Sequence, residues 1–160
     1  MSLPICDSCA SSSVLCSACK KKLDEGKISE LDLRLSRELH HYQVSCYDKA
    51  LEMSGFIVVL APADVVPRII GRGGGTAKRL SRKLDRHVIV IESENSSDCR
   101  TVAEAVVRPD KVVGIGKIYR KDGKEVLKII TQNKGEKENA KRVIEKKVIE
   151  LIIGREVEIG

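Results

Sequence analysis

The sequence predicts an α+β fold in which one order of elements, helix–strand–strand–helix–strand, occurs twice. Two observations predict it. Apolar residues change along the chain between helical spacing and the alternation of a strand. These changes come in the same order over residues 29–91 and 97–159. Each repeat is close to the lower size limit for independent folding, so we expect the two units to pack in tandem.

The first repeat begins with an amphipathic helix expected over residues 29–42. Ser29 and Asp32 have the spacing of a capping box, and apolar residues recur at helical spacing after them. Two β-like runs follow, separated by Ser54-Gly55, which suits a hairpin turn. The remaining elements expected here are strands over 44–53 and 56–60, a short helix over 63–70, a glycine loop over 71–75, a helix over 76–85 and a strand over 87–91.

The second repeat has the same order with a longer final helix. We expect a helix over 97–107, strands over 111–119 and 124–131 with a turn between them, a long helix over 136–152 and a short strand over 157–159. The apolar residues expected to face inward on the long helix are Ala140, Val143, Ile144, Val148 and Leu151.

Length and composition narrow the class of protein. The chain has 160 residues, and no run approaches the roughly 20 apolar residues of a membrane span. The N-terminal residues lack the features of a secretory signal, so a cytoplasmic location is expected, with no membrane partner. With one Phe, three Tyr and no Trp, no expected strand carries the two or three well-placed rings on which a module such as the RRM stacks bases.

The positive charge is concentrated in one segment. The chain has a net charge of +6, and residues 68–86 contain seven basic residues and one acid, Asp85. Outside this segment, the basic and acidic residues balance at 22 each. A solvated helix face usually mixes both signs, whereas this concentration is typical of a surface that binds a polyanion.

A glycine loop lies within this basic segment. Gly71-Arg72-Gly73-Gly74 is a GxxG sequence between two expected helices, where backbone without Cβ atoms can approach a phosphodiester. No Lys-Ser or Lys-Thr follows, as a P-loop requires, and Thr76 stands where a dinucleotide-binding loop has its third glycine. Helix, GxxG and basic helix together are typical of a KH domain. The residues expected to bind single-stranded RNA are Arg68, Ile70, Gly71, Arg72, Gly73, Gly74, Gly75, Lys78, Arg79 and Arg82.

The N-terminal residues 1–27 contain two Cys-x-x-Cys pairs. Cys6, Cys9, Cys16 and Cys19 could fill all four positions of a structural Zn²⁺ site and replace a core that the few apolar residues here cannot build. An iron–sulfur cluster is an alternative to zinc at these four cysteines. A redox-active dithiol would explain only one of the two pairs. Disulfide bonds are disfavoured because the expected compartment is reducing. The two other cysteines, Cys46 and Cys99, are expected to be buried and structural.

The chain resembles a known family in these segments. Three stretches are similar to the tandem KH region of NusA-type transcription factors. They are Ile69 to Leu84, Val88-Ile89-Val90-Ile91-Glu92 leading into a helix, and Arg108-Pro109 before the second hairpin. The N-terminal Leu-Pro-Ile-Cys-Asp-x-Cys resembles archaeal NusA-like proteins. The resemblance implies two type II (prokaryotic) KH units and RNA binding linked to transcription elongation, termination or antitermination.

The resemblance fails at one place in the second unit. After Thr131 the family has a short helix and another GxxG, but residues 132–139 are too few for both, and Glu136 and Glu138 would repel phosphate. The second unit is therefore expected to lack a clamp. It is either structural or extends the RNA surface through Lys134, Lys137, Lys141 and Arg142.

The expected organisation is a zinc-binding head over 1–27, a KH domain with the GxxG clamp over 28–94 and a degenerate KH-like domain without GxxG over 95–160. The favoured function is non-catalytic binding of single-stranded RNA. The alternative is an adaptor whose zinc head docks on RNA polymerase or the ribosome, with RNA binding auxiliary. An enzyme is not expected, because His40, His41 and His87 form no visible pair of nucleophile and base, and no small-molecule substrate is implied.

Overall fold

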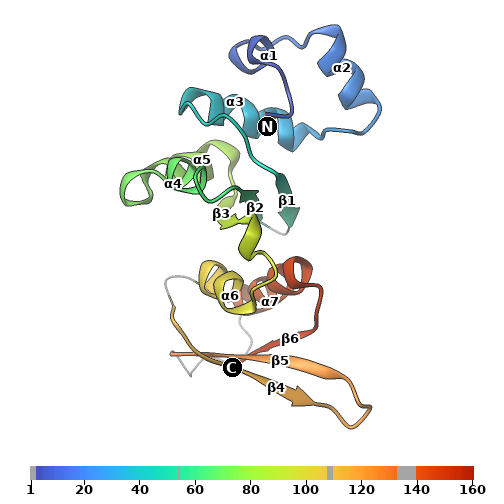
Figure 1. Cartoon of the computed structure of the whole chain (residues 1–160), viewed down its shortest axis with the longest axis vertical. Coiled ribbons are helices and arrows are strands. Elements are labelled where there is room, and N and C mark those ends of the chain that lie inside the picture. The colour runs from blue at the N-terminus through green and yellow to red at the C-terminus, as the bar shows by residue number, and fades with distance from the viewer. Residues whose placement is uncertain (1–2, 54, 108–109, 133–139) are drawn as a thin grey trace. The chain divides into compact units, whose positions relative to one another are not determined.

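The structure is a computed structural model that describes residues 3–53, 55–107, 110–132 and 140–160 (Figure 1). The chain forms two units, Met1–Ser93 and Glu94–Gly160, and each contains one three-stranded sheet with helices. This confirms the predicted α+β class with two similar units. Among the described residues, no helix has both the length and the apolar character needed to cross a membrane.

The first unit begins with the cysteine-rich head, which packs on the first long helix. The helices here are α1 (Asp7–Ser11), α2 (Ser17–Asp24) and α3 (Glu30–His41). The predicted capping box is present: the Asp32 N–H donates to the Ser29 hydroxyl at 3.2 Å, and the Ser29 N–H donates to the Asp32 carboxylate at 2.9 Å. Head residues share a small core with α3, comprising Ile5, Cys9, Ala10, Cys19, Ile28 and Leu33. The head is therefore part of the first unit rather than an appended tail.

The sheet of the first unit has the strand order β1-β2-β3. Its strands are β1 (Lys49–Met53), β2 (Phe56–Ala61) and β3 (His87–Glu92). β1 and β2 are antiparallel, whereas β2 and β3 are parallel. The crossover between these parallel strands consists of α4 (Val66–Ile70), a 3-10 turn η1 (Arg72–Gly74) and α5 (Gly75–Leu84). The glycine loop is thus held between two short helices that both contact β3.

Two predicted boundaries in this unit are wrong, and prolines explain both. β1 begins at Lys49 rather than at residue 44, because its register partner Leu60 is followed by Ala61 and then Pro62, which has no N–H for further pairing. α4 begins at Val66 rather than at residue 63. Pro67 is tolerated in the first turn of a helix but not deeper inside it.

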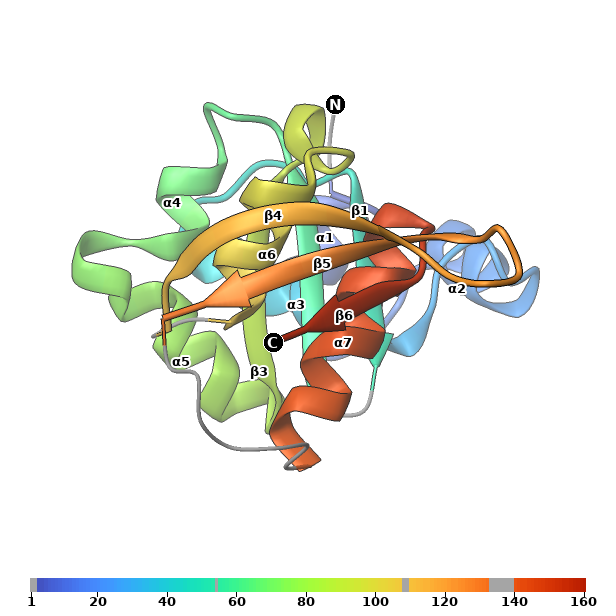
Figure 2. The same cartoon turned by 90° about the horizontal axis from the view of Figure 1, so that it is seen from below.

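The second unit repeats this arrangement. It contains α6 (Cys99–Val107), β4 (Val112–Tyr119), β5 (Glu125–Thr131), α7 (Ala140–Ile153) and β6 (Val157–Ile159), preceded by a 3-10 turn η2 (Ser93–Asn95) (Figure 2). β4 and β5 are antiparallel and β5 and β6 are parallel, as in the first sheet. The connection between the parallel strands is shorter here, spanning residues 132–139 before α7, against residues 62–74 before α5. The segment in which a second GxxG would fall lies mostly outside the described residues.

The inward face of α7 differs from the prediction. Val143 and Leu151 were expected to face inward but are exposed. Val148 is buried as predicted, and Ile149 and Glu145 are buried although they were not expected to be. The buried Glu145 accepts from Arg142 at 3.1 Å, and Arg142 also pairs with Asp110. α7 carries apolar residues on more than one side, so their spacing alone does not fix which side faces the sheet.

Candidate nucleic-acid interface and cysteine cluster

The helix α4 fixes the start of the glycine loop. Val66 and Ile69 are buried in the core of the first unit, and Ile70 is half-buried against it. The helix ends at Gly71, whose N–H donates to the Pro67 carbonyl at 2.9 Å. Gly71 has φ +74° and ψ 175°, a conformation open essentially to glycine alone. The chain therefore turns out of α4 at a defined residue.

Close packing against Thr76 also requires glycine at position 71. A Cβ at this position would lie 2.3 Å from the Thr76 hydroxyl oxygen and 2.7 Å from the Thr76 Cβ. No real Cβ approaches other atoms so closely, so any larger residue would displace Thr76 and the first turn of α5. Thr76 was missed in the sequence analysis, because a threonine after a glycine loop gives no sign of this contact.

At positions 73 and 74 the backbone conformation favours glycine, but the packing does not require it. Gly73 has φ +60° and Gly74 has φ +75°, both in the left-handed region that favours glycine. A Cβ on either would meet no atom within 4 Å. The backbone of the loop is therefore curled by three left-handed glycines, and its outer side is open to a ligand.

Gly75 is the first residue of α5 and has ordinary helical dihedral angles, φ −62° and ψ −42°. No atom lies within 4 Å of its Cβ position, so neither conformation nor packing requires glycine there. The N-cap residue Gly74 offers no side-chain cap, and the first turn of α5 has no acidic residue. The N-terminus of this ten-residue helix thus keeps its partial positive charge for an anion.

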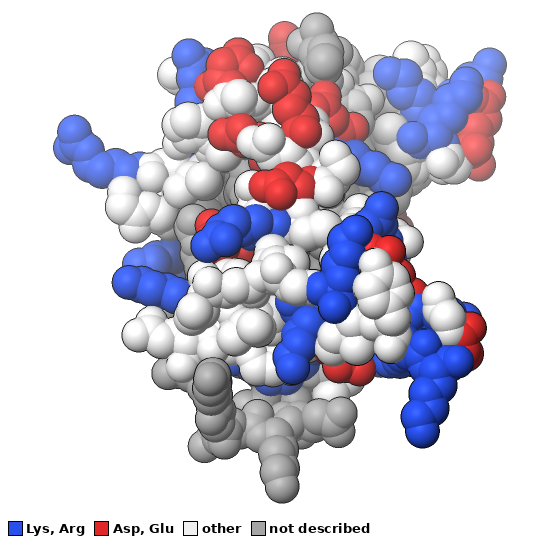
Figure 3. Space-filling view, turned by 60° about the horizontal axis from the view of Figure 1, so that its bottom comes forward, with Lys and Arg blue, Asp and Glu red and all other residues white. Residues whose placement is uncertain are grey.

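Exposed cations surround the loop. Arg72 lies in the turn itself, and Lys78, Arg79 and Arg82 follow Gly75 at helical spacings of three, four and seven residues, which places them on one face of α5. Arg68 is exposed on α4. Within the described residues none of these five side chains is in an ion pair, whereas Arg86 pairs with Glu52 at 3.4 Å. At the left edge of Figure 3, where α4 and α5 lie, Lys and Arg side chains project without Asp or Glu beside them.

The opposite side of α5 holds the helix to the sheet. Leu80 and Leu84 are buried in the core, as predicted from their spacing. The Ser81 hydroxyl donates to the Ala77 carbonyl at 2.8 Å and accepts from the Val88 N–H at 3.1 Å, which joins α5 to β3. Sequence reasoning missed this role of Ser81, and it also passed over Lys83, a further exposed cation on α5.

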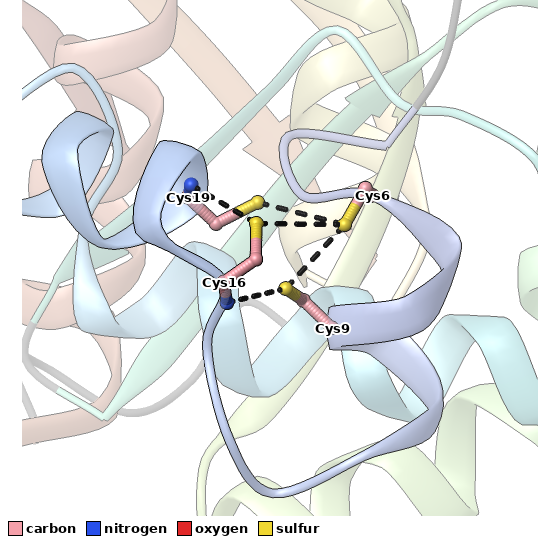
Figure 4. Close-up of side chains that lie close together, drawn as sticks. All are labelled: Cys6, Cys9, Cys16 and Cys19. Atoms are coloured by element: carbon pink, nitrogen blue, oxygen red, sulfur yellow. Dashed lines mark hydrogen bonds between the residues drawn. The ribbon is translucent and has the colours of Figure 1, made fainter.

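The four head cysteines form a second candidate site. Each pair has the same placement, because Cys6 and Cys16 are the N-cap residues of α1 and α2, and Cys9 and Cys19 lie in the first turns. Figure 4 shows the four sulfur atoms pointing toward one another. The ligand atoms all lie within 4.8 Å of one another, so the cluster can hold a metal ion.

The sulfur positions fit tetrahedral coordination. Cys6 Sγ lies 3.4 Å from that of Cys9, 3.9 Å from that of Cys16 and 3.8 Å from that of Cys19. Sulfurs bound to one tetrahedral metal at about 2.3 Å would be separated by about 3.8 Å. Backbone N–H groups also donate to sulfur, from Cys16 to Cys9 at 3.1 Å and from Cys19 to Cys16 at 3.4 Å. The four thiols and their surroundings therefore suit a bound metal ion.

Hydrogen bonds and burial shift the pKa values of two of the cluster thiols in opposite directions. The Cys19 N–H, followed by hydrogen bonds from neighbouring thiols, lowers the pKa of Cys16 to about 6. For Cys9 the Cys16 N–H acts in the same direction, but desolvation and the neighbouring thiols outweigh it and raise the pKa to about 12. The thiolate form, which is the form that binds a metal ion, is thus favoured more at Cys16 than at Cys9.

The other predicted side chains occupy separate places. Cys46 is buried, as predicted, whereas Cys99 is only half-buried. Arg142 is largely buried in its pairs with Asp110 and Glu145, so it supports α7 rather than an RNA surface. Lys134 and Lys137 lie outside the described residues, as does the side chain of Lys141.

Comparison with known proteins identifies the class of the domain that carries the loop. The KH domain family matches residues 56–113, which run from β2 through α4, the glycine loop, α5 and β3 to α6 and the start of β4 in the second unit. This segment, less than half of the chain, thus matches a family of domains that bind single-stranded nucleic acid.

One solved structure that the chain resembles is entitled "Crystal structure of APE1850". It has 21% sequence identity and a TM-score of 0.53, and the match covers 78% of this chain and 96% of that one. At this identity the likeness establishes a shared fold. No curated protein sequence matches the chain.

Proposed function

We propose that this protein binds single-stranded RNA without catalysis, and that the Gly71–Gly74 loop holds the phosphodiester backbone. The observation that carries the proposal is the open, left-handed backbone of Gly73 and Gly74 beside cations that make no ion pairs within the described residues. Close backbone approach and unneutralised positive charge are the two properties that a KH clamp requires.

Each predicted residue has a role in this proposal. Gly71, Gly73, Gly74 and Gly75 let the strand approach the backbone, and Arg72 contacts a phosphate at the tip of the loop. The flanking phosphates meet the cations along the two helices, namely Arg68, Lys78, Arg79 and Arg82. Ile70 offers a half-buried aliphatic surface beside the loop, on which bases can lie. A clamp of this kind holds about four nucleotides, so micromolar affinity that falls with salt is expected.

We propose that the metal of the cysteine cluster is a structural zinc ion. Thiolates are soft ligands suited to Zn²⁺, and with four sulfurs no coordination position stays open for catalysis. When bound, the ion would link α1 to α2. Hydrogen bonds to α3 also hold the head in place, because the Arg37 side chain donates to the Cys9 and Ser13 carbonyls, each at 3.3 Å.

The experiment that tests the RNA proposal measures the affinity of the full chain for a short single-stranded RNA by fluorescence anisotropy. Changing Arg72→Asp together with Gly73→Asp should weaken binding on the order of tenfold or more, because an attractive charge is reversed and new side-chain atoms hold the phosphate away from the backbone. The control variant, Lys20→Asp with Ser13→Asp, changes the net charge equally at exposed positions of the head. Equal affinity of the loop variant and the unchanged protein would rule out the clamp.

We further propose a biological role like that of NusA-type factors in transcription elongation or termination. The support is the resemblance in the sequence of the loop, the second repeat and the cysteine head. The alternative role is an adaptor that docks on RNA polymerase or the ribosome through the head. The exposed Val14, 73% accessible between the two cysteine pairs, favours a protein contact at this place.

These two roles can be separated with a point variant. Deleting residues 1–27 would remove the buried Leu3 and Ile5 from the cores of the first unit, so a deletion would also harm the fold. Val14→Asp leaves those cores intact. Loss of polymerase or ribosome recovery with unchanged RNA affinity would favour the adaptor. Retained recovery together with loss of a transcription effect in the Arg72→Asp variant would favour the RNA-dependent role.

A further inference from the structure

A second group of cations lies on the β4–β5 hairpin of the second unit. Between residues 111 and 128 the chain has six basic residues and two acidic ones. The basic residues are Lys111, Lys117, Arg120, Lys121, Lys124 and Lys128. This group is hidden in the charge balance of the whole chain, because acidic residues elsewhere cancel it.

Ion pairs divide these cations into two sets. Lys117 pairs with Glu125 at 3.0 Å, and Arg120 pairs with Glu156 at 2.7 Å. The lysines nearest the turn are exposed, and the described parts of the chain contain no ion pair for Lys121, Lys124 or Lys128. In Figure 3, Lys and Arg side chains gather at the lower right, with Asp and Glu side chains between them. Lys121 and Lys124 therefore present positive charge at the turn that makes no ion pair within the described residues, while Arg120 also pairs with Glu158 at 3.3 Å and Asp122 lies in the same turn.

An exposed aromatic ring lies at the same end of the hairpin as Lys121 and Lys124. Tyr119, the last residue of β4, is 70% exposed, whereas Tyr47 is buried and Tyr42 and Phe56 are half-buried. Burying an aromatic ring usually stabilises a protein, so a ring kept in solvent beside cations is unusual in a chain with so few aromatics. Tyr119 is directly opposite Glu125 in the strand register, which places it at the end of the hairpin next to the turn.

The turn holds the ring and the lysines in a fixed arrangement. The Gly123 N–H donates to the Arg120 carbonyl at 2.9 Å, and the Arg120 N–H donates to the Lys124 carbonyl at 2.9 Å. Gly123 has φ +82°, and the Asp122 carboxylate accepts from the Lys124 N–H at 3.1 Å. Lys121 and Lys124 are thereby kept within a few residues of Tyr119 on an ordered turn.

From this arrangement we propose that the β4–β5 hairpin is a second binding surface for single-stranded RNA, on which a base stacks on Tyr119 while Lys121 and Lys124 contact the neighbouring phosphates. Stacking on an aromatic ring combined with nearby cations is how proteins bind single strands without sequence preference. An acidic polypeptide would also match the lysines, but base stacking on the solvent-exposed ring of Tyr119 together with contacts between lysines and phosphates favours single-stranded RNA. The surface goes beyond the clamp of the first unit and does not depend on it.

The test uses the absence of tryptophan from the sequence. Tyr119→Trp places a single tryptophan on the hairpin of the full chain, where a stacked base quenches its fluorescence. A single-stranded oligouridylate of about 16 nucleotides is titrated against this variant and against Val14→Trp, which places tryptophan at an exposed site in the head. Quenching at position 119 and none at position 14 is the expected result.

Two further variants make the outcome decisive. Tyr119→Ala should weaken binding of the same RNA at least about fivefold, and Lys121→Ala with Lys124→Ala should reduce the salt slope by about 0.7 for each phosphate that is no longer neutralised. The quenching should persist in the Arg72→Asp, Gly73→Asp background, so failure of the clamp and failure of the hairpin are read separately. Unquenched tryptophan at position 119 and unchanged affinity of Tyr119→Ala would overturn the proposal, and quenching by an acidic peptide instead would assign the surface to protein.

Discussion

Replacing Gly71 by alanine should destabilise the first unit far more than the same change at Gly75. At Gly71 the new Cβ would lie 2.3 Å from the Thr76 hydroxyl oxygen, and the backbone has φ +74°. The conformational strain costs roughly 1–3 kcal/mol and the forced displacement of packed atoms roughly another 1–3 kcal/mol. At Gly75, φ is −62° and no atom lies within 4 Å, so alanine should be neutral or stabilise by up to about 1 kcal/mol.

Urea unfolding followed by circular dichroism measures both free energies of unfolding. Combining Gly71→Ala with Thr76→Gly, which removes the hydroxyl and the Cβ that the new methyl group meets, should recover about 1 kcal/mol or more in a double-mutant cycle. The backbone N of residue 76, 2.9 Å from the new Cβ, keeps the recovery incomplete. Equal effects of alanine at positions 71 and 75, or additivity of the Gly71 and Thr76 changes, would refute this account of the loop.

Three other variants probe a buried phenol, a buried ion pair and the cysteine cluster. Tyr47 is buried, and its hydroxyl donates to the Asp32 carboxylate at 2.7 Å. Burial, and to a lesser extent this hydrogen bond, raises the pKa of the Tyr47 phenol. The folded protein therefore holds the phenol proton more tightly than the unfolded chain does. The protonated Tyr47 phenol contributes fully to the free energy of unfolding below the ordinary tyrosine pKa of about 10, and this contribution is lost as the pH rises above it. Urea titrations at alkaline pH should therefore show a steeper fall in the free energy of unfolding for the unchanged protein than for Tyr47→Phe. Arg142→Leu should cost about 3–5 kcal/mol in thermal unfolding because Glu145 stays buried, and the double change with Glu145→Leu should cost less. Cys16→Ser should reduce the zinc content measured by atomic emission and lower the melting temperature, and a chelator should then have less effect than on the unchanged protein.

Local chemistry made parts of this fold predictable from sequence. The capping box at Ser29 and Asp32 and the short strand β6 lie where their residue patterns indicate. The glycine loop could be located because its residues need dihedral angles that other residues adopt only with strain. The cysteine spacing likewise brings four sulfurs together with few alternatives.

Features that depend on tertiary contacts were not predictable in the same way. The apolar run from residue 44 packs into the core without forming a strand, because pairing stops opposite Pro62. On α7 a charged residue, Glu145, is buried where it pairs with Arg142, and hydrophobic spacing cannot reveal such a buried charge. The contact of Thr76 with Gly71 and the exposure of Tyr119 likewise depend on the folded chain rather than on its local sequence.

The central claim is that the glycine loop itself meets the RNA backbone, and amide chemical shifts test it most directly. The full chain, labelled with ¹⁵N, is titrated with a single-stranded RNA of about four nucleotides, a length matched to one clamp. The account predicts that the largest shifts occur at the amides of Gly73, Gly74, Gly75 and Thr76, and that they disappear in the Arg72→Asp, Gly73→Asp variant. Saturable binding with those amides unmoved would contradict it.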